Sequence, residues 1–466
     1  HVTIGLVLEP PHLDPTATAA EATDQVTYAN IFEGLTRIDE SGAVRPALAH
    51  SWTVSEDGRV YTFELREGVT FHDGTAFDAE DVKFSLDRAR AEGSTNAQRW
   101  LFSTIAAIEI LDPLTVRIRL ERVTADFLTF LGWGDANIVA PESAATNKTR
   151  PVGTGPFRFV RWKRGDSITL ARNSAYWGTP APLAGATFKF IPNPAAAFVA
   201  VMSGDVDAYP NYIAAETLFL FEEDPDFSVV VGSTQGEVVL AINNTRPPFD
   251  DLRVRRAFAH AVDRGELIEG AMFGHGTPIG SHFSPLHPAY IDLTGRYPHN
   301  PARARQLLAE AGYAQGLRVK LKLPPPLYAR RGGEIVAAQL RRIGIEAEIE
   351  SIEWAQWLEQ VYSRRDYDLS IVAHTEPMDY DIYARKGYYF GYADPAFRRL
   401  VERIRKTRAA AERRRLLRQA QRMIAEDAVN AFLFQLPKFG VWDARLSGLW
   451  RDAPVQATDL SRVRFE

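Results

Sequence analysis

Residues 328–390 carry the clearest pattern of apolar and polar positions in the chain. Apolar residues recur at near-helical spacing over 328–343, and Gly344 follows where a helix commonly ends. Residues 345–350 alternate apolar and acidic side chains, which is typical of a half-buried strand. A short helix and a second, mostly apolar strand over 369–373 come next. The stretch therefore predicts a βαβ-like unit, and strand ends in such units open onto crevices where ligands bind.

The rest of the chain alternates short strands and helices. A strand over 1–8 leads into a rigid proline-rich loop, and a helix is expected over 19–35. Short strands joined by turns fill residues 45–120, where Asp78 is expected to cap a helix. Two closing strands are expected over 432–442. Because 466 residues are too many for one ordinary core, we expect an α/β protein of two or three lobes joined by crossing strands.

Composition indicates a soluble globular protein. Hydrophobic residues make up 45% of the chain and charged residues 24%, and these ordinary proportions exclude a disordered chain. The formal net charge of -5 provides no global attraction for nucleic acid or for an anionic membrane surface. No run of about 18 apolar residues occurs, so no membrane-spanning segment is expected. The chain begins at His1, already entering a strand, which fits the removal of a signal segment and favours export.

Motifs that would indicate common enzymes are missing. The chain has no cysteine, which excludes disulfides, thiolate metal sites and a cysteine nucleophile. It contains neither a Gly-x-Ser-x-Gly nucleophile elbow nor a His-Glu-x-x-His zinc motif. Residues 153–155 (Gly-Thr-Gly) resemble part of a phosphate loop, but they lead into a strand, whereas a phosphate site needs a helix N-terminus. Two large classes of hydrolase are therefore disfavoured.

An acidic turn follows the second strand of the central stretch. Its imidazole and three carboxylates are His374, Glu376, Asp379 and Asp381. These groups could recognise a ligand, which we favour, or bind a hard metal ion, because carboxylates and imidazole suit such ions. They could instead be structural and pair with nearby arginines such as Arg330, Arg331 or Arg385. A pair of carboxylates could also serve a glycosidase.

Aromatic residues lie on both sides of the acidic turn. Trp354 and Trp357 precede it, and the aromatic run 388–390 follows it. Aromatic residues are commonly core residues, but Trp354 comes directly after a strand end, on the side where a crevice is expected. Aromatic side chains with a few placed polar groups are typical of a small-molecule pocket.

Six further segments share their order and spacing with one protein family. They are YANIFEGLTR (28–37), DGRVYTFELREGVTFHDG (57–74), GTGPFRFVRW (153–162), ARNSAYWG (171–178), FDDLRVRRAFAHAVDR (249–264) and NPARARQLLAEAG (300–312). Together they resemble the solute-binding proteins of ABC importers in the peptide/nickel-binding family. The resemblance implies a two-lobed α/β periplasmic-binding-protein fold with a third, smaller domain and a hinge between the lobes. It also implies export, closure of the lobes on a solute and delivery of that solute to a membrane permease.

The resemblance suggests domain boundaries, a cellular location and binding partners. Lobe I is expected to combine residues 1–36, 186–238 and 436–466. Residues 37–185 are expected to form the smaller domain, and residues 239–435 to form lobe II with the ligand-binding stretch. We expect a monomer that is periplasmic, or exported and lipid-anchored, with a small-molecule ligand, an ABC permease as partner and no nucleic acid.

The resemblance also assigns roles to residues. The strand-end acid that pairs with the amino group of a bound peptide falls on Glu376, and the tryptophan before the short helix falls on Trp354. A buried ammonium needs an opposing carboxylate, because its desolvation would otherwise cost several kcal/mol. The loop 11–14 is expected to face these residues from the other lobe. The expected ligand-binding residues are Glu376, Trp354, His374, Asp379, Asp381, Arg330, Arg331, Tyr328, Pro11 and His12.

Two departures from the family pattern bear on the ligand. Dipeptide-binding relatives carry an arginine before the helix that starts at Tyr328, where this chain has Leu-Pro-Pro-Pro over 323–326. The strand-end acid is also a glutamate, whose side chain is one methylene longer than that of the aspartate found in the relatives. These departures argue against a standard dipeptide. Three kinds of ligand stay possible: an opine-like or sugar-amine compound, another cationic or amine-bearing molecule, or a peptide bound through its backbone.

We predict a receptor without enzymatic activity, catalytic residues, metal ligands or cofactors. One alternative is the capture of a metal chelate of the nickel type, in which His374 and the acids hold the ion or its organic complex. A less favoured alternative is an exported hydrolase that uses carboxylates. Loss of binding in EDTA would identify chelate capture, and substrate turnover with a carboxylate-controlled pH profile would identify an enzyme.

Overall fold

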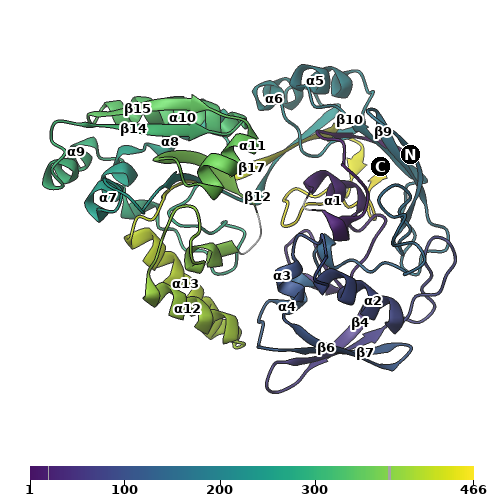
Figure 1. Cartoon of the computed structure of the whole chain (residues 1–466). Coiled ribbons are helices and arrows are strands. Elements are labelled where there is room, and N and C mark those ends of the chain that lie inside the picture. The colour runs from purple at the N-terminus through teal and green to yellow at the C-terminus, as the bar shows by residue number, and fades with distance from the viewer. Residues whose placement is uncertain (19, 376–378) are drawn as a thin grey trace. The chain divides into compact units, whose positions relative to one another are not determined.

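The computed structural model describes residues 1–18, 20–375 and 379–466 (Figure 1). The chain divides into two compact units. Unit 1 contains His1–Gly232 and Lys438–Glu466, and unit 2 contains Ser233–Pro437. The further separation of residues 37–185 as a domain of their own stays a prediction.

Two long strands belong to both units. They are β12 (Phe227–Ile242) and β17 (Ala431–Asp443). The units are therefore joined by strands, as the sequence predicts. Residues 432–442, which were expected to form two closing strands, belong to the single strand β17.

The first sheet of unit 1 contains the N-terminal strand. Its strands are β1 (Val2–Leu6), β8 (Phe157–Lys163), β9 (Ser167–Arg172), β10 (Gly185–Phe190) and β11 (Ala208–Tyr209). β1 lies parallel to β10 and β11, whereas β8, β9 and β10 are antiparallel neighbours. Apolar side chains of β1 and β10, among them Ile4 and Phe188, are fully buried in the core of this unit.

The second sheet of unit 1 is antiparallel and has its own hydrophobic core. Its strands, in spatial order, are β4 (Ala49–Val54), β5 (Val60–Leu65), β7 (Thr115–Leu120) and β6 (Ile105–Asp112). Helix α2 (Ala79–Arg90) packs against β6 and β7. The predicted N-cap of this helix is confirmed, since the Asp78 side chain accepts a hydrogen bond from Glu80 N at 2.8 Å.

The smaller elements of unit 1 lie outside these two sheets. They are α1 (Glu21–Thr27), α3 (Arg99–Phe102), α4 (Phe127–Phe130), α5 (Pro194–Met202), α6 (Leu218–Glu222) and the short strands β2 (Thr36–Ile38), β3 (Val44–Pro46), β18 (Leu446–Ser447) and β19 (Arg464–Phe465).

Unit 2 contains a mixed sheet with helices packed on it. Its strands follow the order β15 (Ile345–Ser351), β14 (Leu317–Leu323), β16 (Leu369–His374), β12 and β17, and β13 (Thr277–Pro278) pairs with β17. β14 is parallel to both β15 and β16, and β12 is antiparallel to β16. The helices are α7 (Leu252–Ala261), α8 (Arg264–Met272), α9 (Pro301–Glu310), α10 (Leu327–Arg341), α11 (Trp354–Trp357), α12 (Pro395–Lys406) and α13 (Ala410–Glu426). α10 packs against α8 and β15, and α12 packs against α13 (Figure 1).

Strand β14 was not among the predicted elements, although its residues alternate strictly between aliphatic and basic side chains. β14 lies between β15 and β16, the two strands of the predicted βαβ-like unit. The βαβ unit is therefore β14-α10-β15, and β16 pairs with the other edge of β14. All three strands run in one direction, so their carboxyl ends lie at the same edge of the sheet.

The helix expected over 19–35 is shorter, since α1 covers only Glu21–Thr27. The carbonyl groups of Asn30 and Ile31 accept hydrogen bonds from Phe157 N and Gly155 N, each at 2.9 Å. The backbone after α1 therefore pairs with the Gly-Thr-Gly segment instead of continuing the helix. This pairing explains the glycines, because a Cβ on Gly155 would lie 2.4 Å from Asn30 O.

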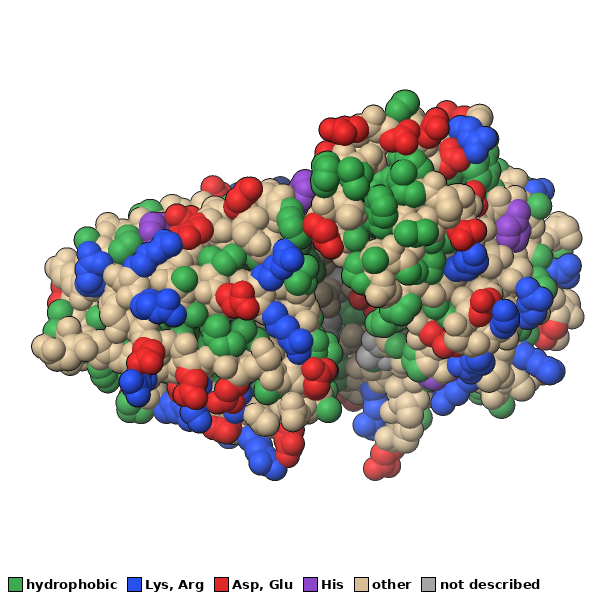
Figure 2. Space-filling view, turned by 90° about the horizontal axis from the view of Figure 1, so that it is seen from above, with side chains coloured by type: hydrophobic (Ala, Val, Ile, Leu, Met, Phe, Trp, Pro, Cys, Tyr) green, Lys and Arg blue, Asp and Glu red, His purple; other side chains and the backbone are tan. Residues whose placement is uncertain are grey.

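Acidic and basic side chains are interspersed over the face of the molecule shown in Figure 2. On the arginine-rich helix α13, Arg415 pairs with Glu412 at 2.7 Å. This mixture of charges is that of an ordinary solvated surface, in keeping with the net charge of -5.

Replacing Gly155 by alanine is expected to destabilise unit 1 by about 1–3 kcal/mol, because the new methyl group collides with backbone. Gly93→Ala is the matched control, since Gly93 has open space around its Cβ position and should change stability by no more than about 0.5 kcal/mol. Urea unfolding monitored by circular dichroism measures both. Equal stability of the two variants would contradict the close approach.

Acid is expected to destabilise unit 1 through His72. Its Nε2 lies 2.9 Å from Gly155 O, its Nδ1 accepts from Gly153 N at 3.3 Å, and burial lowers the pKa of the imidazole to about 4. Below pH 6.5 His72 binds a proton in the unfolded chain but not in the folded chain. Stability that is present at neutral pH is therefore lost as the pH falls. The loss should reach about 3 kcal/mol at pH 4.

Unfolding of the wild type and of His72→Gln in urea at pH 7 and pH 4 checks this expectation. The acid-induced loss should be smaller in His72→Gln, whereas the exposed His50 provides a control variant, His50→Gln, that keeps the full loss. An identical loss in all three proteins would show that His72 does not contribute to it.

Candidate functional site

A buried cluster of two imidazoles and one carboxylate lies at the end of β16 in unit 2. His374 is the last residue of β16, His282 follows β13, and Asp379 begins the 3-10 helix Asp379–Ala384. His282 Nε2 lies 2.7 Å from Asp379 Oδ1, and His374 Nδ1 lies 3.4 Å from Asp379 Oδ2. The three side chains are at most 9% exposed, so they interact in surroundings largely shielded from water.

A tyrosine hydroxyl contacts the far nitrogen of each imidazole. His282 Nδ1 lies 3.2 Å from Tyr383 Oη, and His374 Nε2 lies 3.0 Å from Tyr389 Oη. Asn430 Nδ2 in turn donates to Tyr383 Oη at 3.1 Å. Each ring is thus fixed at both nitrogens, which defines its orientation.

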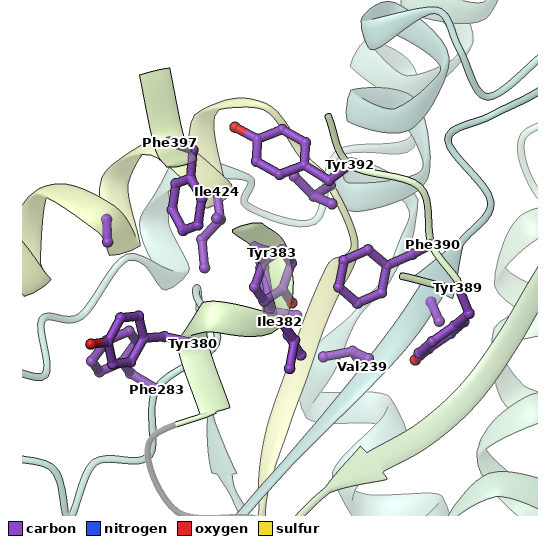
Figure 3. Packing of buried hydrophobic residues seen from close by; sticks show 14 of the residues in the cluster. Val239, Phe283, Tyr380, Ile382, Tyr383, Tyr389, Phe390, Tyr392, Phe397 and Ile424 are labelled. Atoms are coloured by element: carbon purple, nitrogen blue, oxygen red, sulfur yellow. The ribbon is translucent and has the colours of Figure 1, made fainter. Parts of the chain in front are cut away.

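The two tyrosines belong to the aromatic core of unit 2 (Figure 3). The ring centroids of Tyr383 and Phe390 are 4.7 Å apart, and Tyr389 and Phe390 are essentially inaccessible to solvent. The aromatic run 388–390 therefore contributes mainly to packing, with Tyr388 partly buried beside it. This core keeps the polar cluster in a low-dielectric environment, where electrostatic interactions are strong.

Glu237 places a second carboxylate beside the cluster. It lies on β12 directly opposite His374 in the antiparallel pairing with β16, and it is only 5% exposed. Burial raises the pKa of Glu237 well above its usual range, and the Asp379 carboxylate raises it further. Burial also acts to raise the pKa of Asp379, but His282 and His374 together hold it below its usual value. The surroundings of the two carboxylates thus shift their pKa values in opposite directions.

A cavity of about 10 Å³ adjoins the cluster. It is lined by Gln235, Glu237, His282, Phe283, Ser284, His287, Asp379 and Tyr380. A volume of this order holds about one water-sized occupant. The cavity is thus far too small for a peptide or another organic solute.

Asp381, a predicted ligand-binding residue, is paired within unit 2. Its carboxylate accepts from Arg385 Nη2 at 2.8 Å and from Arg405 Nη2 at 2.5 Å. Two guanidinium groups thus neutralise a carboxylate that is 11% exposed. The acidic turn could recognise a ligand, bind a metal ion or pair with arginines, and the contacts of Asp381 fit the pairing with arginines.

Three predicted ligand-binding residues lie around the ends of β15 and β16. Trp354 follows β15, is 42% exposed and packs edge-on against Trp357. Arg330 pairs with Glu353 at 3.1 Å. Tyr328 Oη accepts a hydrogen bond from Ala373 N at 3.0 Å, which ties α10 to β16, and burial raises the pKa of this phenol to about 12.

The remaining predicted residues are spread over the chain. The Arg331 guanidinium lies 4.9 Å from the ring centroid of Phe273. Pro11 and His12 belong to unit 1, where Pro11 is exposed and His12 Nδ1 accepts from Asp14 N at 3.3 Å. Glu376 lies outside the described residues, so its assigned role stays a prediction.

His374 and Asp379 were among the predicted site residues, whereas His282, Glu237 and Tyr383 were not. Glu237 carries a signal that could have been used, since it is a charged residue at the head of the apolar run 238–242. His282 carries no such signal in the sequence, because it contacts Asp379 across 97 positions of the chain.

Comparison with known proteins identifies the family. Residues 43–394 match the family model of the bacterial extracellular solute-binding proteins, family 5 (middle). Heme-binding protein A of Haemophilus influenzae is 31% identical over 376 residues, which cover 73% of this chain and 67% of that protein. The glutathione-binding protein GsiB of Salmonella paratyphi A is 31% identical over 351 residues, covering 74% and 68%. The chain belongs to the family 5 extracellular solute-binding proteins.

The fold agrees with this assignment. The periplasmic binding protein AgaA from A. tumefaciens R10, solved in complex with agropinic acid, aligns with a TM-score of 0.83 and 25% identity over 100% of this chain and 98% of AgaA. The expected fold of the two-lobed periplasmic binding proteins and the resemblance to ABC-importer receptors are thus confirmed. Within the described residues, none of the helices is long and apolar enough to cross a membrane.

Asp381→Asn is expected to lower the stability of unit 2 by about 1–3 kcal/mol, because it removes a buried charge from two arginines. Glu402→Gln is the control, since Glu402 bonds the same Arg405 at 2.9 Å from an exposed position. This control should cost less than about 0.5 kcal/mol. Thermal unfolding measures both, and a fully stable Asp381→Asn variant would contradict the structural role of this residue.

Proposed function

We propose that this chain is the receptor of an ABC importer that captures a small peptide or another amine-bearing compound and delivers it unchanged to a membrane permease. The observation that carries the proposal is the match of residues 43–394 to the extracellular solute-binding family. Relatives named for glutathione and for a complex with agropinic acid support a small organic solute of this class. We place the protein in the periplasm, or on the outer face of the membrane through a lipid anchor, as a monomer.

The predicted contacts with the solute follow the topology of unit 2. Trp354 comes after the carboxyl end of β15, and Glu376 comes two residues after that of β16. Because β15 and β16 both run parallel to β14, their carboxyl ends lie at the same edge of the sheet, which supports a solute site at that edge. The half-exposed indole of Trp354 offers an apolar face, and the Glu376 carboxylate would bind the ammonium group of the solute.

A binding role fits the chemistry of the histidine cluster better than catalysis does. In a hydrolytic triad, the histidine beside the carboxylate contacts a nucleophile that it can deprotonate. The group in that place beside His282 is the Tyr383 hydroxyl, and burial raises the pKa of this phenol well above its usual value. Tyr383 is also only 1% exposed inside the aromatic core, where a solute does not reach its hydroxyl, which supports a receptor that releases its solute unchanged.

Glu376→Gln is expected to weaken binding of the solute roughly 10- to 100-fold, because it removes the charge that opposes the ammonium group. Glutathione, tetra-alanine and agropinic acid serve as probes in a thermal-shift screen, since a compound that binds the folded chain raises its stability. The affinity of the best probe is then measured calorimetrically. Glu348→Gln is the charge-matched control, because Glu348 is exposed on β15.

The acetylated form of the best probe tests the same interaction from the side of the ligand. It lacks the charged amine and should lose about as much affinity for the wild type as the parent compound loses for Glu376→Gln. Unchanged affinity in both experiments would remove Glu376 from the ammonium-binding role. Turnover of a probe would refute the receptor function itself.

A further inference from the structure

The buried cluster in unit 2 contains two carboxylate oxygens that its hydrogen bonds do not satisfy. Among the residues that the structure describes, Glu237 Oε2 and Asp379 Oδ2 are buried without a hydrogen-bond donor. The nearest imidazole nitrogen to Asp379 Oδ2 is His374 Nδ1 at 3.4 Å. Unsatisfied buried carboxylate oxygens are costly and need a specific explanation.

A buried carboxylate in unit 1 shows how this fold otherwise satisfies such a group. Glu33 accepts hydrogen bonds from Thr154 Oγ1 and Tyr176 Oη at 2.8 Å and from Trp177 Nε1 at 2.9 Å. Three donors therefore surround one carboxylate there. In unit 2, backbone groups of Ser284 and Glu237 bond the Glu237 carboxylate, yet one oxygen of each carboxylate still lacks a donor among the described residues, and a cation would satisfy them.

The donor atoms are arranged as metal ligands would be. One donor atom from each of His282, His374 and Asp379 lies within 4.8 Å of the other two. Ligands of a tetrahedral zinc ion lie roughly 3.4 Å apart, so side-chain shifts of about 1 Å would bring the three donor atoms to that spacing. Two imidazoles and one carboxylate suit first-row transition metals better than calcium or magnesium, which prefer oxygen donors.

The surroundings of the imidazoles agree with this role. A histidine that binds a metal through one nitrogen usually holds a hydrogen-bond partner at the other, which fixes the ring. Tyr383 and Tyr389 provide such partners for His282 and His374. The cavity of about 10 Å³ next to Glu237 has room for one water molecule beside the ion.

We propose that His282, His374 and Asp379 bind one divalent transition-metal ion, zinc or nickel in class, with Glu237 accepting a hydrogen bond from a water on that ion. On binding, each imidazole donates a nitrogen lone pair to the ion, and the His282 proton shifts from Nε2 to Nδ1, where the Tyr383 hydroxyl oxygen can accept it. This site lies within unit 2 and is made of protein ligands alone. It therefore differs from the capture of a metal chelate as a solute, and it does not depend on which solute the receptor carries.

Equilibrium dialysis of the full chain, stripped of metal and then exposed to zinc or nickel chloride at micromolar concentration, tests the proposal. Elemental analysis should find one ion per chain. His282→Gln and Asp379→Asn should lose this ion, whereas His260→Gln should retain it, because His260 lies on α7, where its Nδ1 bonds Pro298 O. Tyr389→Phe should weaken the affinity about 10- to 100-fold by releasing the His374 ring.

A spectroscopic measurement keeps the test decisive if a variant fails to fold. Pulsed electron paramagnetic resonance of copper(II) bound to the wild type counts the coordinated imidazoles, and two are expected. No stoichiometric metal, fewer than two imidazoles, or equal affinity in His282→Gln and Asp379→Asn would overturn the site. Such a result leaves solute binding untouched, since solute affinity is measured separately on metal-free protein.

Discussion

A carboxylate buried in an aromatic core must be compensated, and the polar interior of unit 2 is arranged around this constraint at Asp379. An isolated buried charge would cost several kcal/mol, which is a large part of the stability of a folded domain. Two imidazoles surround Asp379, and two tyrosine hydroxyls orient those imidazoles. The tyrosines are in turn held by the packing of the core that Figure 3 shows. The proposed metal ion would complete this compensation.

The sequence segments that resemble the family contribute to the stability of the fold. Gly155 allows close pairing with the backbone at Asn30, and His72 binds the carbonyl group of Gly155. These contacts lie in unit 1 and depend on backbone geometry, so they are compatible with many solutes. The sequence could therefore identify an importer receptor while leaving its ligand open.

Local patterns predicted the elements that depend on neighbouring residues. The N-cap at Asp78 and the strands β15 and β16 could be read from spacing alone. The helix expected over 19–35 ends early because its backbone pairs with a segment more than 120 residues away, which no local pattern shows. The histidine cluster could be predicted only in part for the same reason, since His282 and Glu237 reach it through tertiary packing and strand pairing.

The central claim is that the chain binds an organic solute and releases it unchanged. Native mass spectrometry of the purified protein, followed by denaturation and identification of the released compound, tests this claim most directly. The account predicts one equivalent of an amine-bearing organic compound per chain, chemically intact on release. A purified protein that is empty and binds none of the amine-bearing probes, or that converts a probe into product, would contradict it.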